Sequence, residues 1–193
     1  MLVNESTGVS DIAQQLYEQT LVLRSQMGDE AAFEELVRLH SPRLRFFIRK
    51  MLHEMPDADD DILQDAWLAV YRSLPKLENA AAFRAWLYRI TRDRIYRELK
   101  KRRLPVSQLS EAELNSAAEV SPAADERIEE LLARTHALSV EHREALVLRF
   151  VEEMSYDEIA RVTGSSLGTV RSRIHYAKRA LRRAFEEKSY EPK

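Results

Sequence analysis

Two clusters of basic side chains carry the chemistry that this sequence offers. Residues 84–103 contain nine bases against two acids, and residues 161–183 contain seven bases and no acid. The whole chain has a formal charge of only −2, so positive charge is concentrated in these two blocks. A single basic run is more often a solvated helix face. A pair of them on a nearly neutral protein, each with apolar helical spacing, favours two contacts with one polyanion such as DNA.

Bond-making chemistry has little support in the sequence. The absence of cysteine excludes disulfides, thiolate zinc sites and iron–sulfur clusters. The four glycines form neither a dinucleotide-binding nor a P-loop motif, and the five histidines form no metalloprotease motif. We therefore expect no cofactor, no metal and no enzymatic activity. No signal peptide opens the chain and no apolar run approaches the ~20 residues of a membrane span, so a cytoplasmic protein is the default expectation.

The elements that must position the basic clusters are predicted to be helices, because glycine and proline are scarce and apolar residues recur at helical spacing. We expect an all-α protein with two small helical domains, residues 11–103 and 125–187. Between them, residues 104–124 are acidic and contain two prolines, which is typical of a flexible linker. The predicted helices are 11–27 (capped by Ser10), one around 33–51 that Pro42 kinks or splits, 57–74, 83–103, 125–136, 139–151, 155–163 and 166–187.

A helix-turn-helix is expected in the second domain. Ser155 and Glu158 have the spacing of a capping box, Gly164 suits the left-handed residue that ends a helix, and Ser166 can cap the next helix. The long second helix has an apolar face and an opposite polar, basic face, as a recognition helix in a major groove does. An ordinary amphipathic hairpin with a basic face is the alternative. The residues expected to be buried are Leu167, Val170, Ile174, Ala177 and Leu181.

Several blocks in a fixed order resemble the extracytoplasmic-function (ECF) sigma factors of bacterial RNA polymerase. The resemblance covers about residues 21–183. In the second domain it is carried by the runs 143–150 (REALVLRF), 155–160 (SYDEIA) and 168–175 (GTVRSRIH). In the first domain it is carried by Gly28-Asp29, Ala32-Phe33, residues 61–65 (DILQD) and residues 83–90 (FRAWLYRI).

The resemblance implies a role for each block, with core RNA polymerase, promoter DNA and an anti-sigma factor as partners. The helix that starts near Asp57 resembles the element that docks on the polymerase clamp, although its first-turn acids also suit the helix dipole. The polymerase-binding residues implied are Asp61, Gln64, Asp65 and Leu68. The 83–103 helix and the loop before it resemble the element that melts the minus-ten region. The residues implied there are Asn79, Arg84, Tyr88, Arg89, Arg92, Asp93, Tyr96, Arg97 and Lys100. The last helix resembles the minus-thirty-five reader, through Thr169, Arg171, Ser172, His175, Tyr176 and Arg179.

Some positions depart from the family pattern or leave two interpretations open. The family often has Asn at the position of Asp93, so this acid is expected to contact a base amino group or a neighbouring arginine. Arg is frequent at the position of Tyr176. Trp86 is expected in the core, whereas Tyr88 and Tyr96 are expected to be more open. The function predicted is a non-catalytic sigma factor that binds core polymerase, selects promoters and helps melt DNA. The alternatives are a stand-alone helix-turn-helix regulator and, less favoured, an enzyme or a purely helical adaptor.

Overall fold

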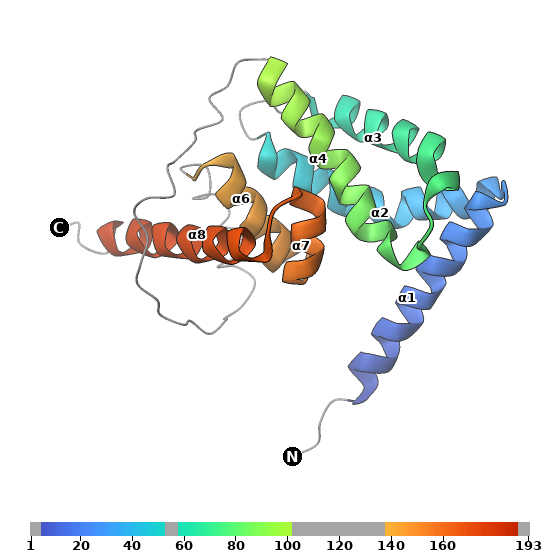
Figure 1. Ribbon diagram of the computed structural model, residues 1–193, viewed down its shortest axis with the longest axis horizontal. Helices are drawn as coiled ribbons and strands as arrows, with labels where there is room; N and C mark the ends of the chain where they lie inside the picture. The colour runs from blue at the N-terminus through green and yellow to red at the C-terminus, as the bar shows by residue number, and fades with distance from the viewer. Residues whose placement is uncertain (1–4, 53–57, 102–137, 189–193) are drawn as a thin grey trace.

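The computed structural model describes residues 5–52, 58–101 and 138–188, and every regular element in these ranges is helical (Figure 1). This confirms the all-α prediction. Within the described residues, no helix combines the length and apolar character needed to cross a membrane. The elements are α1 (Glu5–Gln26), α2 (Glu30–Met51), α3 (Asp59–Ser73), the short 3-10 turns η2 (Leu74–Lys76) and η3 (Ala80–Ala82), α4 (Phe83–Lys101), α6 (Val140–Leu146), the π-helical turn η5 (Val147–Val151), α7 (Tyr156–Thr163) and α8 (Leu167–Lys188).

Helices α1 to α4 form the N-terminal unit, in which each helix packs against the next. The Asp29 carboxylate accepts the backbone N–H of Ala32 at 3.0 Å, which satisfies one of the free donors at the start of α2. Each helix then turns its apolar stripe inward, because burial of that stripe is the main source of helix stability in a protein. The fully buried side chains of α2 and α4 include Leu36, Leu44, Phe47, Phe83, Leu87 and Ile95.

One sequence-based expectation for this unit is wrong, and a second is wrong in one of its two alternatives. Helix α1 begins at Glu5, so Ser10 lies inside the helix and does not cap it. Adding turns to an existing helix needs no new nucleus, and residues 5–10 contain no proline to stop it. Pro42 does not split its helix, because α2 is continuous from Glu30 to Met51. Both halves of α2 bury side chains in the same core, and the free energy gained from this burial outweighs the loss of the backbone hydrogen bond that Pro42 cannot donate.

Helices α6, α7 and α8 with η5 form the C-terminal unit, and the expected helix-turn-helix is present. The Ser155 hydroxyl accepts the Glu158 backbone N–H at 3.2 Å, and the Glu158 carboxylate accepts the Ser155 N–H at 2.8 Å. Gly164 ends α7 with φ of 66°, in the left-handed region. Val170, Ile174, Ala177 and Leu181 are buried as expected, but Leu167 is 45% exposed. Leu167 is the first residue of α8, so no preceding turn of that helix shields its side chain.

One buried cluster runs through both units. It joins core residues of α1 to α4 with Val147, Leu148, Met154 and other residues of the C-terminal unit. Helix α4 packs against α7, and α2 packs against α6 (Figure 1). The predicted linker 104–124 and the predicted helix 125–136 lie outside the described residues. The domain limits 11–103 and 125–187 therefore stay predictions.

Candidate nucleic-acid and polymerase interfaces

Helix α4 carries two neighbouring rows of side chains, and only one of them faces solvent. Residues four apart in a helix lie on the same face. We call the row against the C-terminal unit the covered row: Arg84, Tyr88, Arg92 and Tyr96, which are buried or partly buried. We call the neighbouring exposed row the open row: Arg89, Asp93, Arg97 and Lys100. Eight of the nine predicted minus-ten residues are thus divided between these two rows.

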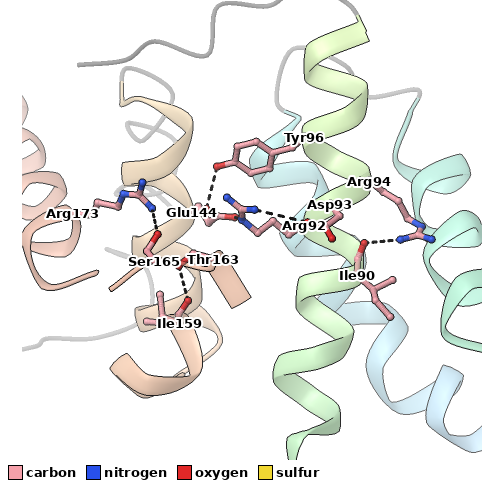
Figure 2. A network of polar contacts seen from close by, with 10 residues as sticks. All are labelled: Ile90, Arg92, Asp93, Arg94, Tyr96, Glu144, Ile159, Thr163, Ser165 and Arg173. Atoms are coloured by element: carbon pink, nitrogen blue, oxygen red, sulfur yellow. Dashed lines mark hydrogen bonds and ion pairs between the residues drawn. The ribbon is translucent and has the colours of Figure 1, made fainter. Parts of the chain in front are cut away.

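The C-terminal half of the covered row surrounds the carboxylate of Glu144, which α6 contributes (Figure 2). Arg92 Nε donates to Glu144 Oε1 at 2.7 Å, and the Tyr96 hydroxyl donates to Oε2 at 3.1 Å. The Arg92 guanidinium also stacks 4.1 Å from the centre of the Tyr96 ring. Glu144 has no exposed surface. One buried carboxylate therefore holds an arginine and a tyrosine of α4 in a fixed geometry.

The N-terminal half of the covered row surrounds a second acid, Glu152, at the end of η5. The Tyr88 hydroxyl donates to Glu152 Oε2 at 2.5 Å, and Arg84 donates to the Glu152 backbone carbonyl. The guanidinium groups of Arg84 and Arg43 lie 3.9 and 4.0 Å from the same Oε2. Glu152 is also fully buried, and its Oε1 has no hydrogen-bond partner within the described part of the chain.

Burial sets the electrostatics of this interface. Loss of water raises the pKa of Glu144 and of Glu152, and the nearby arginines and tyrosine hydroxyls oppose that rise. Loss of water beside the acids also raises the pKa of Tyr88 and of Tyr96. The tyrosines therefore act as hydrogen-bond donors, and the arginines supply the positive charge that an ionised carboxylate needs in this setting.

The remaining sequence-predicted residues of this region have defined places. The expectation that Tyr88 is open is wrong, because only 1% of it is exposed and α4 presses this face against the C-terminal unit. Tyr96 is partly buried, and Trp86 packs at the edge of the core as expected. Asp93 lies 3.9 Å from Arg92, the neighbouring arginine allowed for above. Asn79 is exposed and caps η3, accepting the Ala81 N–H at 3.0 Å.

Helix α8 presents a polar, basic face to solvent. Arg171, Ser172 and Arg179 are exposed, while Thr169, His175 and Tyr176 are partly exposed. Some of these groups are occupied: the Ser172 hydroxyl donates to the Thr169 carbonyl at 2.9 Å, and the Tyr176 ring packs against His142. Arg171 has no hydrogen bond or ion pair to any other described residue. Its guanidinium is therefore available to a phosphate or a guanine edge.

Helix α3 divides its acids between two tasks. Asp59 is buried and accepts from Arg49 Nε at 2.5 Å, and Asp60 pairs with Arg45, so these two acids fasten α3 to α2. The side chains predicted to bind polymerase point away from the core: Asp61, Gln64, Asp65 and Leu68 are all exposed, Leu68 by 46%. The neighbouring Leu63 and Trp67 are buried in the core. The exposed group is an acidic surface with one apolar side chain, Leu68, at its C-terminal end.

Replacing Asp59 with asparagine should lower the free energy of unfolding by about 1 kcal/mol near pH 7, because a charge-assisted hydrogen bond to a partly exposed arginine is lost. The Arg49 hydrogen bond lowers the pKa of Asp59 below its ordinary 3.8. Such a group stabilises the fold above its unfolded pKa and loses that contribution as the pH falls through its folded pKa. The difference between the two proteins in urea unfolding should thus shrink below about pH 4. If the difference in unfolding free energy stays constant down to pH 2, ionised Asp59 is not the group that stabilises the fold through Arg49.

Sequence reasoning missed the two acids that organise the interface. Glu144 appeared only as part of the 143–150 run, and Glu152 was not singled out. A signal was present for Glu144, because on a helical wheel it falls on the same stripe as Val140, Val147 and Val151. An acid on an apolar stripe indicates a buried partner. The identity of that partner depends on how the two units pack, which no local pattern specifies.

Family models match most of the chain. Residues 22–104 match the model described as "Sigma-70 region 2", and residues 128–181 match "Sigma-70, region 4". The ECF RNA polymerase sigma-E factor of Escherichia coli (strain K12) is 32% identical over 184 residues, covering 88% of this chain and 95% of the relative. The RNA polymerase sigma-H factor of Pseudomonas aeruginosa is 34% identical over 182 residues, covering 88% and 94%.

Solved structures agree with the sequence matches. CnrH in complex with the cytosolic domain of CnrY is 27% identical with a TM-score of 0.66, covering 89% of this chain and 98% of that one. The sigma factor RpoE of Bartonella quintana, solved in complex with the anti-sigma factor NepR, is 26% identical with a TM-score of 0.63, covering 80% and 96%. Both sigma regions, in the order found above, lie on a fold shared with sigma factors. The chain therefore belongs to the ECF sigma factors, which direct RNA polymerase to promoters.

Proposed function

We propose that the three exposed surfaces described above divide the work of promoter recognition. The acidic face of α3 binds core polymerase, α4 melts and holds the minus-ten element, and α8 reads the minus-thirty-five element. The observation that carries this proposal is the presence of basic faces on two different units of one chain, α4 with its open row and α8 with Arg171 and Arg179. A regulator that binds one operator needs only the second of them.

The charge of each surface fits its proposed target. Asp61 and Asp65 with Leu68 suit a basic partner that also offers apolar contact. The basic side chains of the open row and of α8 suit phosphates. The rings of Tyr88 and Tyr96 would offer stacking surfaces for unstacked nucleobases once the C-terminal unit moves away from them. Because most of the affinity comes from phosphate contacts, promoter binding should weaken steeply with salt.

The remaining parts of the proposal concern partners and place of action. The B. quintana relative was solved with an anti-sigma factor, and we propose that this chain is also held inactive by one. The polymerase carries out all bond chemistry, so the chain itself needs no catalytic residue. Since its targets are the polymerase and the chromosome, we place the protein in the cytoplasm.

Reconstitution with core polymerase tests this function directly. The chain plus core enzyme should produce transcripts from defined start sites on genomic templates, and core enzyme alone should not. A gel shift compares the free chain with the holoenzyme on the same promoters. Strong specific binding by the free chain, with no transcript from the reconstituted enzyme, would support a stand-alone regulator instead.

A further inference from the structure

The structure buries the covered row of α4 under the C-terminal unit of the same chain. Three of its four members contact a carboxylate oxygen of Glu144 or Glu152 within hydrogen-bond distance, and the fourth, Arg84, contacts the Glu152 backbone carbonyl. In the proposed function these same arginines and tyrosines face promoter DNA. We infer that this arrangement is a closed form in which Glu144 and Glu152 occupy the place of nucleic acid on α4. The inference rests on the proposed role of α4 and adds that closure and DNA binding exclude each other.

The chemistry of the contact resembles that of a nucleic-acid site. An arginine and a tyrosine hydroxyl converge on each carboxylate, as they would on the oxygens of a phosphate. The Arg92 guanidinium stacks 4.1 Å from the Tyr96 ring centre, which occupies a face otherwise open to a base. Glu144 thus pairs with the charge of Arg92 and bonds the Tyr96 hydroxyl, while the Arg92 guanidinium covers the Tyr96 ring.

A third contact reinforces closure without touching the covered row. Arg143 of α6 is 3% exposed, and its guanidinium donates to the backbone carbonyls of Met51 at 3.2 Å and of Leu138 at 3.2 Å. Met51 ends α2, where unpaired carbonyls and the helix dipole favour a cation. The closed form is therefore fastened at α2 as well as along α4.

Two features of the closed form cost free energy: one buried oxygen has no hydrogen-bond partner, and one residue has an unfavourable backbone conformation. Glu152 Oε1 is buried without a hydrogen-bond partner in the described residues, which is unusual for a carboxylate in a permanent core. The next residue, Glu153, has φ of 54°, a left-handed conformation that costs a non-glycine residue energy. Opening of the interface would let water reach Glu152 and let this turn relax. Closure is therefore reversible in our proposal.

The distance between two fluorescent labels on the full chain tests the closed form. The labels can be attached at introduced cysteines alone, because the protein contains no native cysteine. Glu34→Cys in α2 and Asp157→Cys in α7 place one label on an exposed position of each unit. Single-molecule energy transfer should show one dominant closed population in the free chain. The isosteric pair Glu144→Gln with Glu152→Gln removes both carboxylate charges, and the open fraction should rise roughly tenfold or more, since charge-assisted bonds are the strong ones. Glu141→Gln with Glu153→Gln makes the same charge change on neighbouring positions and should leave the distribution unchanged.

Binding of single-stranded dT20 tests occlusion. The Glu144→Gln, Glu152→Gln protein should bind dT20 at least fivefold more tightly than the Glu141→Gln, Glu153→Gln control, which has the same net charge. If the transfer distributions of these two proteins are the same, the closed form is overturned. If the Glu144→Gln, Glu152→Gln protein opens and still binds dT20 no better than the control, occlusion is overturned.

A second pair of substitutions separates that failure from failure of the proposed function. Added to the Glu144→Gln, Glu152→Gln protein, Arg89→Glu with Arg97→Glu reverses two charges of the open row, which closure does not cover. Weaker dT20 binding in this protein shows that α4 does bind DNA, so only the role of the covered row is wrong. Unchanged binding shows instead that α4 is not a DNA surface, and then the proposed function of α4 fails together with the inference.

Discussion

Replacing Arg171 with glutamate should lower promoter-specific initiation by the reconstituted enzyme by about 100-fold, equivalent to about 2.7 kcal/mol. The guanidinium is exposed near the start of α8 and has no partner among the described residues, so its loss should leave the fold intact. A good arginine contact to a base or phosphate is worth about 1–3 kcal/mol, and a carboxylate in its place adds repulsion from the DNA backbone. Initial transcription rates at one defined promoter over a range of salt concentrations measure the effect.

Two further substitutions show what kind of contact Arg171 makes. Lysine at this position keeps a point charge but loses the planar fork, so Arg171→Lys should retain most activity if the partner is a phosphate and lose most of it if the partner is a guanine. Arg38→Glu makes the same charge change on α2, on an arginine with a 70% exposed side chain, and should leave initiation nearly unchanged. Equal losses in Arg171→Glu and Arg38→Glu would mean that only net charge matters and that α8 does not read the promoter.

Reversing the charges of Asp61 and Asp65 together should weaken binding to core polymerase by about 100-fold, because two like charges are then set against a basic partner. Both side chains are exposed, and neither is used in an ion pair within the described residues, so the fold should tolerate arginine there. Fluorescence anisotropy of the labelled chain titrated with core enzyme gives the dissociation constant. The loss should be smaller at high salt, where exposed charges are screened.

The matched control for docking is Glu34→Arg, an exposed acid on α2 that is not one of the predicted polymerase-binding residues. A single arginine here should change the dissociation constant less than about twofold, the range expected for an isolated surface charge. Leu68→Ala probes the apolar side chain of the same face and should weaken docking without altering its salt dependence. Full-strength docking by the Asp61→Arg, Asp65→Arg protein would remove α3 from the polymerase interface.

Local signals predicted the helix-turn-helix well. The Ser155 capping box, the left-handed Gly164 and the apolar spacing of Val170, Ile174 and Ala177 all act within a few residues, so one sequence is enough to place them. The exposed acidic residues of α3 were expected from the resemblance to the family and not from local spacing. Leu167 and the start of α1 were wrong because helix ends depend on how far packing and propagation extend, which the spacing does not fix.

Packing between the units could not be predicted in the same way. Tyr88 looks open on its own helix, but its ring centre lies 5.4 Å from that of Phe47 on α2, and its hydroxyl donates to Glu152, 64 residues further along the chain. Asp59 and Asp61 have nearly the same sequence context, yet Asp59 is buried and accepts a hydrogen bond from Arg49, whereas Asp61 is exposed. Partners that lie far apart in the sequence decide these cases, and a single sequence holds no record of which distant side chains meet.

The buried cluster that spans both units has a consequence for how the protein denatures. Both tryptophans, Trp67 and Trp86, belong to the N-terminal unit, so their emission reports on that unit alone. Circular dichroism in the far ultraviolet reports on all the helices. Because Val147, Leu148 and Met154 share one apolar interior with α2 and α4, melting of one half strips cover from the other. The two signals should therefore change at the same temperature, as they do in a single cooperative transition.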